Sequence, residues 1–259
     1  MNLPHELLDE IFSYIPPDDR KSFRVYSLVA RSWVSPAQRR LFSSVVITMD
    51  NYQPWKDNIS PANTELLNHV RSLLYFTTGR SPSWKSLSIN DFFDYLPSFR
   101  CLQHLTLCGV HIKLDISEQL EVFSAFRHTL STLTLSALFL TWRTFTTIVN
   151  YFPDMRDLTV LHIVWELHHR QAPPLSRPLR GRLSIDMHQD QGLPIFANRL
   201  SGLDVEYDEL LFLGTLDPGP STSLHQRIVD SCRKSLKRLR LSPRSCTFRY
   251  VQDHVMRVN

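Results

Sequence analysis

Residues 102–107, LQHLTL, and residues 130–135, LSTLTL, carry leucines at the same L-x-x-L-x-L spacing. Apolar residues at alternate positions are typical of a short strand with one buried face. Related copies, some with other apolar residues, stand at 70–75, 155–160, 183–185, 200–205 and 236–241. The central leucines are Leu105, Leu133, Leu158, Leu183, Leu203 and Leu239, at intervals of 28, 25, 25, 20 and 36 residues. We therefore expect a repeated element whose last interval holds an insertion.

The segments between these copies have helical spacing, most clearly in 118–128 and 142–152. A strand and a helix that alternate stack into a parallel-stranded solenoid, because each repeat buries its apolar face against the next. The pattern resembles leucine-rich repeats, whose period is about 20–29 residues. It lacks the Asn or Cys that usually stands three positions after the last leucine of each copy. We expect an α/β fold with an irregular leucine-rich-repeat-like solenoid over 67–259; an α/β repeat body of another kind is the alternative.

The residues between the leucines are expected to point outward on the concave side of such a solenoid. They are His104, Thr106, Thr132, Thr134, Asp157, Thr159, Asp204 and Arg240. This polar strip is the candidate binding site for a target protein. Plain solvation of a sheet face is the alternative for each residue.

Three short helices are predicted before residue 47. The first begins with Pro4 at its first helical position, ends at Pro16-Pro17, and has one apolar face. That face consists of Leu7, Leu8, Ile11, Phe12 and Ile15. The second helix is expected over 20–31, with Trp33 just after it. The third is expected to start at the Ser35-Pro36 cap and to end near 41–42.

Residues 3–15, LPHELLDEIFSYI, resemble the start of an F-box, and residues 27–33, SLVARSW, with 39–42, RRLF, are similar to its second half in many fungal members. Asp18-Asp19-Arg20-Lys21 stands where many members carry Leu after the central Asp. The resemblance covers roughly residues 1–47, less than a fifth of the chain. It predicts a helical module over 1–47, a linker or surface loop over 48–66, and the repeat body after it.

This resemblance implies docking onto a Skp-type adaptor of a cullin–RING ubiquitin ligase, with a substrate protein held by the rest of the chain. Such a receptor is not itself an enzyme. The residues that match the adaptor-facing or core pattern are Leu3, Pro4, Leu7, Ile11, Leu28, Val29 and Trp33. The alternative is that they only pack the N-terminal helices onto the body.

The composition favours a cytoplasmic or nuclear protein without a membrane partner. The four cysteines show no C-x-x-C spacing and are expected to be free thiols in a reducing compartment. The N-terminus lacks the basic and apolar regions of a secretory signal, and the longest uncharged run, 129–142, is too short to span a bilayer.

Catalytic, cofactor and metal motifs are absent from the sequence. His162, Glu166, His168 and His169 form a local cluster, for which a solvated loop is favoured over a metal site. Lys and Arg are concentrated in 227–257, but leucines at strand spacing interrupt them, so nucleic acid is an unlikely partner. The leading hypothesis is a substrate receptor; the alternatives are an adaptor-binding scaffold without ubiquitin output, or a nucleic-acid binder.

Overall fold

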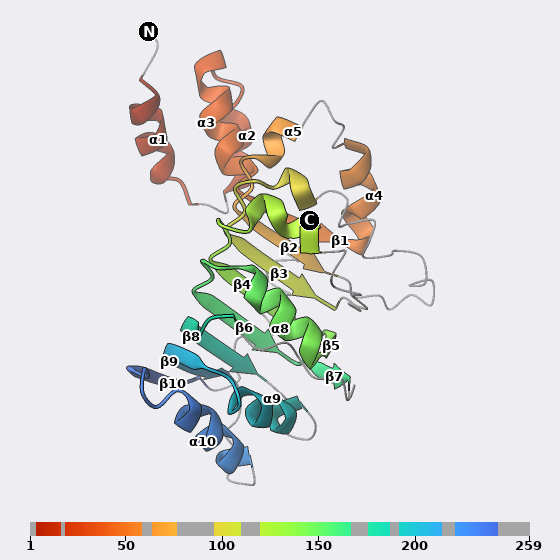
Figure 1. The fold of residues 1–259 in the computed structure, drawn as a ribbon. Helices are drawn as coiled ribbons and strands as arrows, with labels where there is room; N and C mark the ends of the chain where they lie inside the picture. The colour runs from red at the N-terminus through yellow and green to blue at the C-terminus, as the bar shows by residue number, and fades with distance from the viewer. Residues whose placement is uncertain are drawn as a thin grey trace.

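A computed structural model describes residues 4–16, 19–58, 64–76, 96–109, 120–166, 176–186, 192–213 and 221–242. Within these residues the chain forms three N-terminal helices followed by a mixed α/β body (Figure 1). The body is built on an eight-stranded sheet, and the three helices lie beyond its first strand.

The N-terminal helices are α1 (His5–Ser13), α2 (Arg20–Tyr26) and α3 (Arg31–Leu41). Three predicted boundaries are wrong. Pro4 is the N-cap of α1 rather than its first helical residue, and α2 stops at Tyr26 because the chain turns over 27–29. The third helix starts at Arg31 after the extended Ala30, not at Ser35-Pro36. Pro36 is therefore inside α3, where its missing N–H removes one helical hydrogen bond near the start of the helix.

A small aromatic core holds these helices together. Phe12, Phe23 and Ala37 are fully buried, and the Phe12 ring lies 5.8 Å from the Phe23 ring and 5.7 Å from the Trp33 ring. Because α3 starts at Arg31, Trp33 lies in its first turn. The partly buried indole of Trp33 packs against this core. The cluster is separate from the large core of the body.

The sheet consists of parallel strands in chain order, β1-β2-β3-β4-β6-β8-β9-β10. The strands are β1 (Ser44–Thr48), β2 (Ser72–Phe76), β3 (His104–Cys108), β4 (Thr132–Ser136), β6 (Asp157–Leu161), β8 (Leu179–Asp186), β9 (Val205–Leu213) and β10 (Arg238–Ser242). Short strands β5 (Phe139–Thr141) and β7 (Val164–Glu166) pair beside it. Parallel neighbours need crossover connections. Helical segments lie in these connections, except between β6 and β8, where the only described element is β7.

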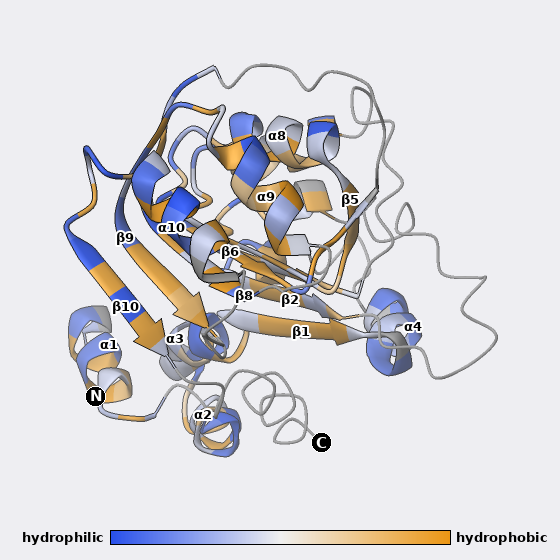
Figure 2. Cartoon of the chain, turned by 90° about the horizontal axis from the view of Figure 1, so that it is seen from below, coloured by the Kyte–Doolittle hydropathy of each residue, from blue (hydrophilic) through white to orange (hydrophobic). Residues whose placement is uncertain are grey.

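Helices cover one face of the sheet. These are α8 (Trp142–Tyr151), α9 (Gly192–Leu200) and α10 (Ser221–Ser231), which lie together on one side of the strands (Figure 2). Two 3-10 turns, η2 (Leu96–Ser98) and η3 (Leu120–Phe126), contact each other earlier in the body. The opposite face, which we call the open face, carries the polar residues between the leucines.

The central apolar residues of successive strands stand in register, and this corrects the predicted repeat. The central ladder is Val45, Leu73, Leu105, Leu133, Leu158, Leu183, Leu210 and Leu239. Its intervals are 28, 32, 28, 25, 25, 27 and 29 residues. The central residue after Leu183 is Leu210, not Leu203, because α9 extends to Leu200 and β9 begins only at Val205. The insertion expected before Leu239 is therefore absent from the repeat.

The predicted linker over 48–66 is also wrong for the residues that the structure describes. Residues 49–58 form α4 (Met49–Asn58) and 64–67 form α5 (Thr64–Leu67). The turn into α4 is fixed by Asn51, whose side-chain oxygen accepts from the Thr48 N–H at 2.7 Å and whose amide donates to the Val46 carbonyl at 3.0 Å. Tyr52 is buried in the body core, so this segment is part of the packed unit.

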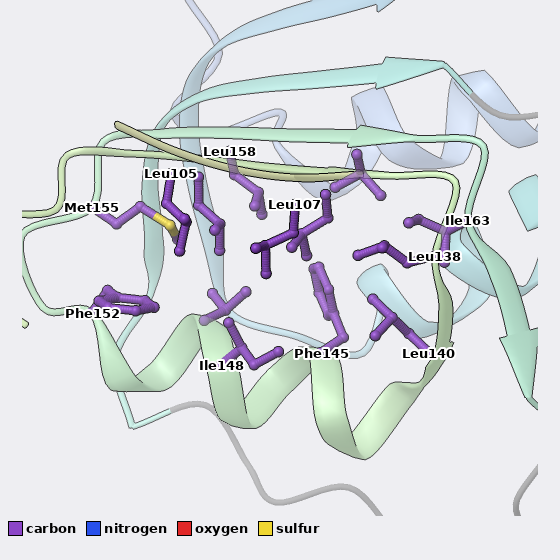
Figure 3. Packing of buried hydrophobic residues seen from close by; sticks show 14 of the residues in the cluster. Leu105, Leu107, Leu138, Leu140, Phe145, Ile148, Phe152, Met155, Leu158 and Ile163 are labelled. Atoms are coloured by element: carbon purple, nitrogen blue, oxygen red, sulfur yellow. The ribbon is translucent and has the colours of Figure 1, made fainter. Parts of the chain in front are cut away.

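The core lies between the sheet and its helices (Figure 3). Leu105, Leu107 and Leu158 point from the strands toward Phe145, Ile148 and Phe152. Phe145 and Ile148 share one face of α8 at helical spacing, as the sequence predicts, and Phe152 is the C-cap of the helix. Apolar residues that recur about every 3.6 positions in the helix thus pack against apolar residues at every second position of the strands, in one continuous core.

Candidate functional site

Helix α1 divides its predicted apolar face between the core and solvent. Leu8 and Phe12 are fully buried. Leu7 and Ile11 are 45% and 39% exposed, and Tyr14 after the helix is 81% exposed. Leu7 and Ile11 stand four residues apart, so they neighbour each other along the helix. The result is an apolar stripe in solvent beside an intact core.

The turn between α2 and α3 exposes a second apolar group. Leu28 is 85% exposed and Val29 is 59% exposed. The turn itself is ordered by backbone bonds from Leu28 to Val25 and from Val29 to Tyr26, at 3.0 and 3.1 Å. These side chains are thus held in solvent on a defined backbone. We call Leu7, Ile11, Leu28 and Val29 the exposed apolar set.

Polar contacts fix the helices that carry this set. Asp19 is the N-cap of α2: its carboxylate accepts from the Ser22 hydroxyl at 2.6 Å and from the Ser22 N–H at 3.1 Å. These hydrogen bonds lower the pKa of Asp19 below its ordinary value, because they favour the charged carboxylate. Arg20 donates to the Ser44 carbonyl at 2.8 Å, which joins the start of α2 to β1. Asp9 and Arg39 add an exposed ion pair at 3.4 Å between α1 and α3.

The open face of the sheet carries two outward rows. One row holds His104, Thr132, Asp157, Arg182, Glu209 and Arg238 in register; the other holds Thr106, Thr134, Thr159, Ser184, Leu211 and Arg240. Hydroxyl groups dominate over β3, β4 and β6. Charged residues dominate over β8, β9 and β10.

The charged part is an ion-pair network across four strands. Arg182 lies 3.9 Å from Asp157 and 3.1 Å from Glu209, and Arg240 lies 3.0 Å from Glu209. Glu209 is buried in the fold, with 10% of its side chain exposed, so its two arginine partners offset the cost of removing its charge from water. Arg182 and Arg240 thus both pair with Glu209 across neighbouring strands.

The structure brings together most of the residues predicted to bind a target. His104, Thr106, Thr132, Thr134, Asp157, Thr159 and Arg240 share the open face. Asp204 does not join them: it precedes β9, and its carbonyl accepts from the Leu179 N–H. Sequence reasoning missed Arg182, Ser184 and Glu209. The alternation in 205–213 could have found Glu209, had the strand been placed there instead of at 203–205.

The residues predicted to face an adaptor divide into three groups. Leu7, Ile11, Leu28 and Val29 are exposed, as is Pro4 at the start of α1. Trp33 belongs to the aromatic core, where it is partly buried. Leu3 lies outside the described residues.

The His162 cluster is not a helix in the described residues. Glu166 ends strand β7, and His168 and His169 lie outside the described part. His162 instead pairs with the buried Asp186, with 3.6 Å between its Nε2 and the carboxylate. Among the residues described, no group of three or more His, Cys, Asp or Glu side chains is placed to hold a metal ion.

The cysteines of the described residues are free thiols. Cys101 is exposed, whereas Cys108 and Cys232 are buried. Burial raises the pKa of Cys232 to about 11, so its thiol stays protonated and unreactive at neutral pH. Cys246 lies outside the described residues.

Comparison of the chain with models of known protein families, and with curated proteins, gave no match. In the described part of the chain, no helix combines the length and the apolar character that a membrane crossing requires.

Proposed function

We propose that this protein is a non-catalytic substrate receptor of a cullin–RING ubiquitin ligase. Its N-terminal helices dock onto a Skp-type adaptor, and its repeat body holds a target protein. In this proposal helices α1, α2 and α3 belong to an F-box, and the parallel sheet with its helices is an irregular leucine-rich-repeat-like solenoid. The receptor speeds ubiquitin transfer by holding the lysines of the target near the transferring enzyme.

The observation that supports docking is the exposed apolar set. The three helices have a finished core of their own in Phe12, Phe23 and Ala37, so Leu7, Ile11, Leu28 and Val29 are not needed to close it. Apolar side chains held in solvent on ordered elements mark protein-interaction surfaces. The residues are also those that match the adaptor-facing positions of the F-box pattern.

The target is assigned to the open face. Hydroxyls over β3, β4 and β6 next to charges over β8, β9 and β10 offer hydrogen bonds and ion pairs over several strands, and repeat proteins commonly bind partners on such extended surfaces. His104, Thr106 and Thr134 are polar residues of this face on β3 and β4.

The test is binding of the purified full chain to a Skp-type adaptor. Leu7→Asp and Leu28→Asp put a charge into the proposed interface without touching the aromatic core. We expect each to weaken binding about tenfold or more, as for apolar residues central to an interface. Trp33→Ala is unsuitable, because it would disturb the helices themselves.

The control is Val164→Asp on strand β7, since Val164 is 45% exposed, like Leu7, but lies in the body. It should leave adaptor binding unchanged. If the parent chain does not bind the adaptor, or if Val164→Asp is as harmful as Leu7→Asp, the proposal fails. If the adaptor binds but the target's lifetime does not change when the cullin is inactivated, the chain is an adaptor-binding scaffold without ubiquitin output.

A further inference from the structure

Strand β10, the last described strand of the sheet, leaves apolar side chains in solvent. Leu239 and Leu241 stand in register with Leu210 and Phe212 of β9, which are buried. Yet Leu239 is 49% exposed and Leu241 is 54% exposed. In the described residues, no strand pairs with the other edge of β10. An uncovered edge of this kind is a template for another strand.

The backbone of β10 presents donors at this edge. The Lys237 N–H donates to the Asp208 carbonyl at 2.8 Å, toward β9. With Arg238 opposite Glu209 in a parallel pair, the N–H groups of Arg238, Arg240 and Ser242 point to the β9 carbonyls, so those of Leu239 and Leu241 face the open edge. An extended chain laid along β10 could therefore accept hydrogen bonds in the register of the existing sheet.

The charges on the open face indicate what the next strand would carry. The first outward row runs Asp157, Arg182, Glu209, Arg238, so its sign alternates from strand to strand. Arg182 and Arg240 both contact Glu209 across strands, at 3.1 and 3.0 Å. The pattern ends on arginine at β10. An acidic residue on an added strand would continue it.

We propose that the open edge of β10 binds an extended segment of another protein as an added strand, in which acidic residues alternate with apolar ones. The apolar residues cover Leu239 and Leu241 on one face. The acidic residues pair with Arg238 and Arg240 on the other. A second copy of this chain fits poorly, because pairing two β10 edges would set arginines against arginines, and like charges on facing strands repel. The inference does not depend on adaptor docking.

The experiment measures binding of short, capped, fluorescent peptides to the full chain by anisotropy. One peptide alternates glutamate with valine, and a second alternates lysine with valine. We expect the acidic peptide alone to bind the parent. Arg238→Glu should weaken acidic-peptide binding roughly threefold to tenfold, as expected for exposed charge pairs whose sign is reversed, and should improve binding of the lysine peptide.

Two further comparisons separate strand addition from general attraction to a basic surface. Lys234→Glu makes the same charge change outside β10. It should alter binding of the acidic peptide less than twofold, because Lys234 precedes the strand and salt screens its charge. Leu241→Pro removes one edge donor while keeping every charge, and a proline is tolerated where the N–H faces away from the sheet. It should weaken binding of the acidic peptide more than Leu241→Ala, which keeps the donor.

Four results would overturn the proposal. They are no binding of the acidic peptide to the parent, equal weakening by Lys234→Glu and Arg238→Glu, equal binding by Leu241→Pro and Leu241→Ala, and binding of a single-stranded oligonucleotide instead of the peptide. The last would identify a nucleic-acid surface. Circular dichroism of each variant checks that the sheet remains folded.

Discussion

One residue with a left-handed backbone conformation follows each of three successive strands, and two of these residues are not glycine. Gly109, Ala137 and His162 have φ of 71°, 53° and 51° after β3, β4 and β6, respectively. Each donates its N–H to the next strand: Gly109 to Ser136, Ala137 to Leu161, and His162 to Asp186. A left-handed conformation costs a residue with a Cβ about 1–2 kcal/mol, a cost that glycine avoids.

At this scale we predict that Ala137→Gly stabilises the protein. The relieved strain exceeds the added entropy of the unfolded chain, which leaves a net gain of about 0.5 kcal/mol. Ala137→Val should destabilise, because a β-branched side chain fits the left-handed region least well. Urea unfolding of the three proteins should give the stability order Gly, Ala, Val; an alanine protein more stable than the glycine variant would contradict this account.

Among the elements, β8 has an irregularity that depends on one glycine. The register between β8 and β9 shifts at Gly181/Arg182, and Gly181 has φ of 90°. A Cβ at this position would lie 2.0 Å from the Arg156 carbonyl oxygen on the preceding strand segment. The bulge therefore requires both the conformation and the close approach that only glycine permits.

Gly181→Ala should consequently destabilise the sheet by about 2–3 kcal/mol or more, the scale of backbone strain plus a backbone clash. Gly202→Ala is the matched control, because its Cβ would meet the Arg199 carbonyl oxygen at an ordinary 3.6 Å. Thermal unfolding compares the two. Similar melting temperatures for both variants would show that the bulge tolerates a side chain.

The elements that could be predicted from sequence are those whose apolar period is unambiguous. The strands around Leu105, Leu133 and Leu158 and the helix carrying Phe145 and Ile148 lie where the spacing places them. The strand predicted around Leu203 fails, since Leu200 and Leu203 mimic a copy of the repeat while closing α9 and its turn. The sequence assigns most of β1 to the helical module over 1–47, because the apolar run at 45–47 has no L-x-x-L-x-L copy that marks it as a strand of the repeat.

The candidate site was less predictable than the fold. Periodicity placed Leu7, Leu8, Ile11 and Phe12 on one face of α1, but only the packing of α2 and α3 decides that Leu8 and Phe12 are buried and that Leu7 and Ile11 are exposed. The open face followed from strand alternation. Its ion-pair network did not, because it depends on the register of β8, β9 and β10.

At the scale of the whole molecule, the residues that the structure describes form two cores. The aromatic core of the N-terminal helices is separate from the core that runs through the sheet.

Phe12→Ala should lower the stability of the small core by about 3–5 kcal/mol and loosen α1, α2 and α3. Phe196→Ala, in α9, should act on the body instead. Hydrogen exchange resolved by segment should separate the two effects; a Phe12→Ala variant that loosens β8 and β9 as much as α1 would show a single cooperative core.

The central claim is that the N-terminal helices dock a Skp-type adaptor while the open face stays free for a target. Hydrogen exchange of the full chain, with and without saturating adaptor, tests it most directly. We predict slower exchange in α1 and in the turn over 27–29, and unchanged exchange in β3, β4 and β6. Protection of the sheet strands with no change in α1 would contradict the claim, as would no change in any segment.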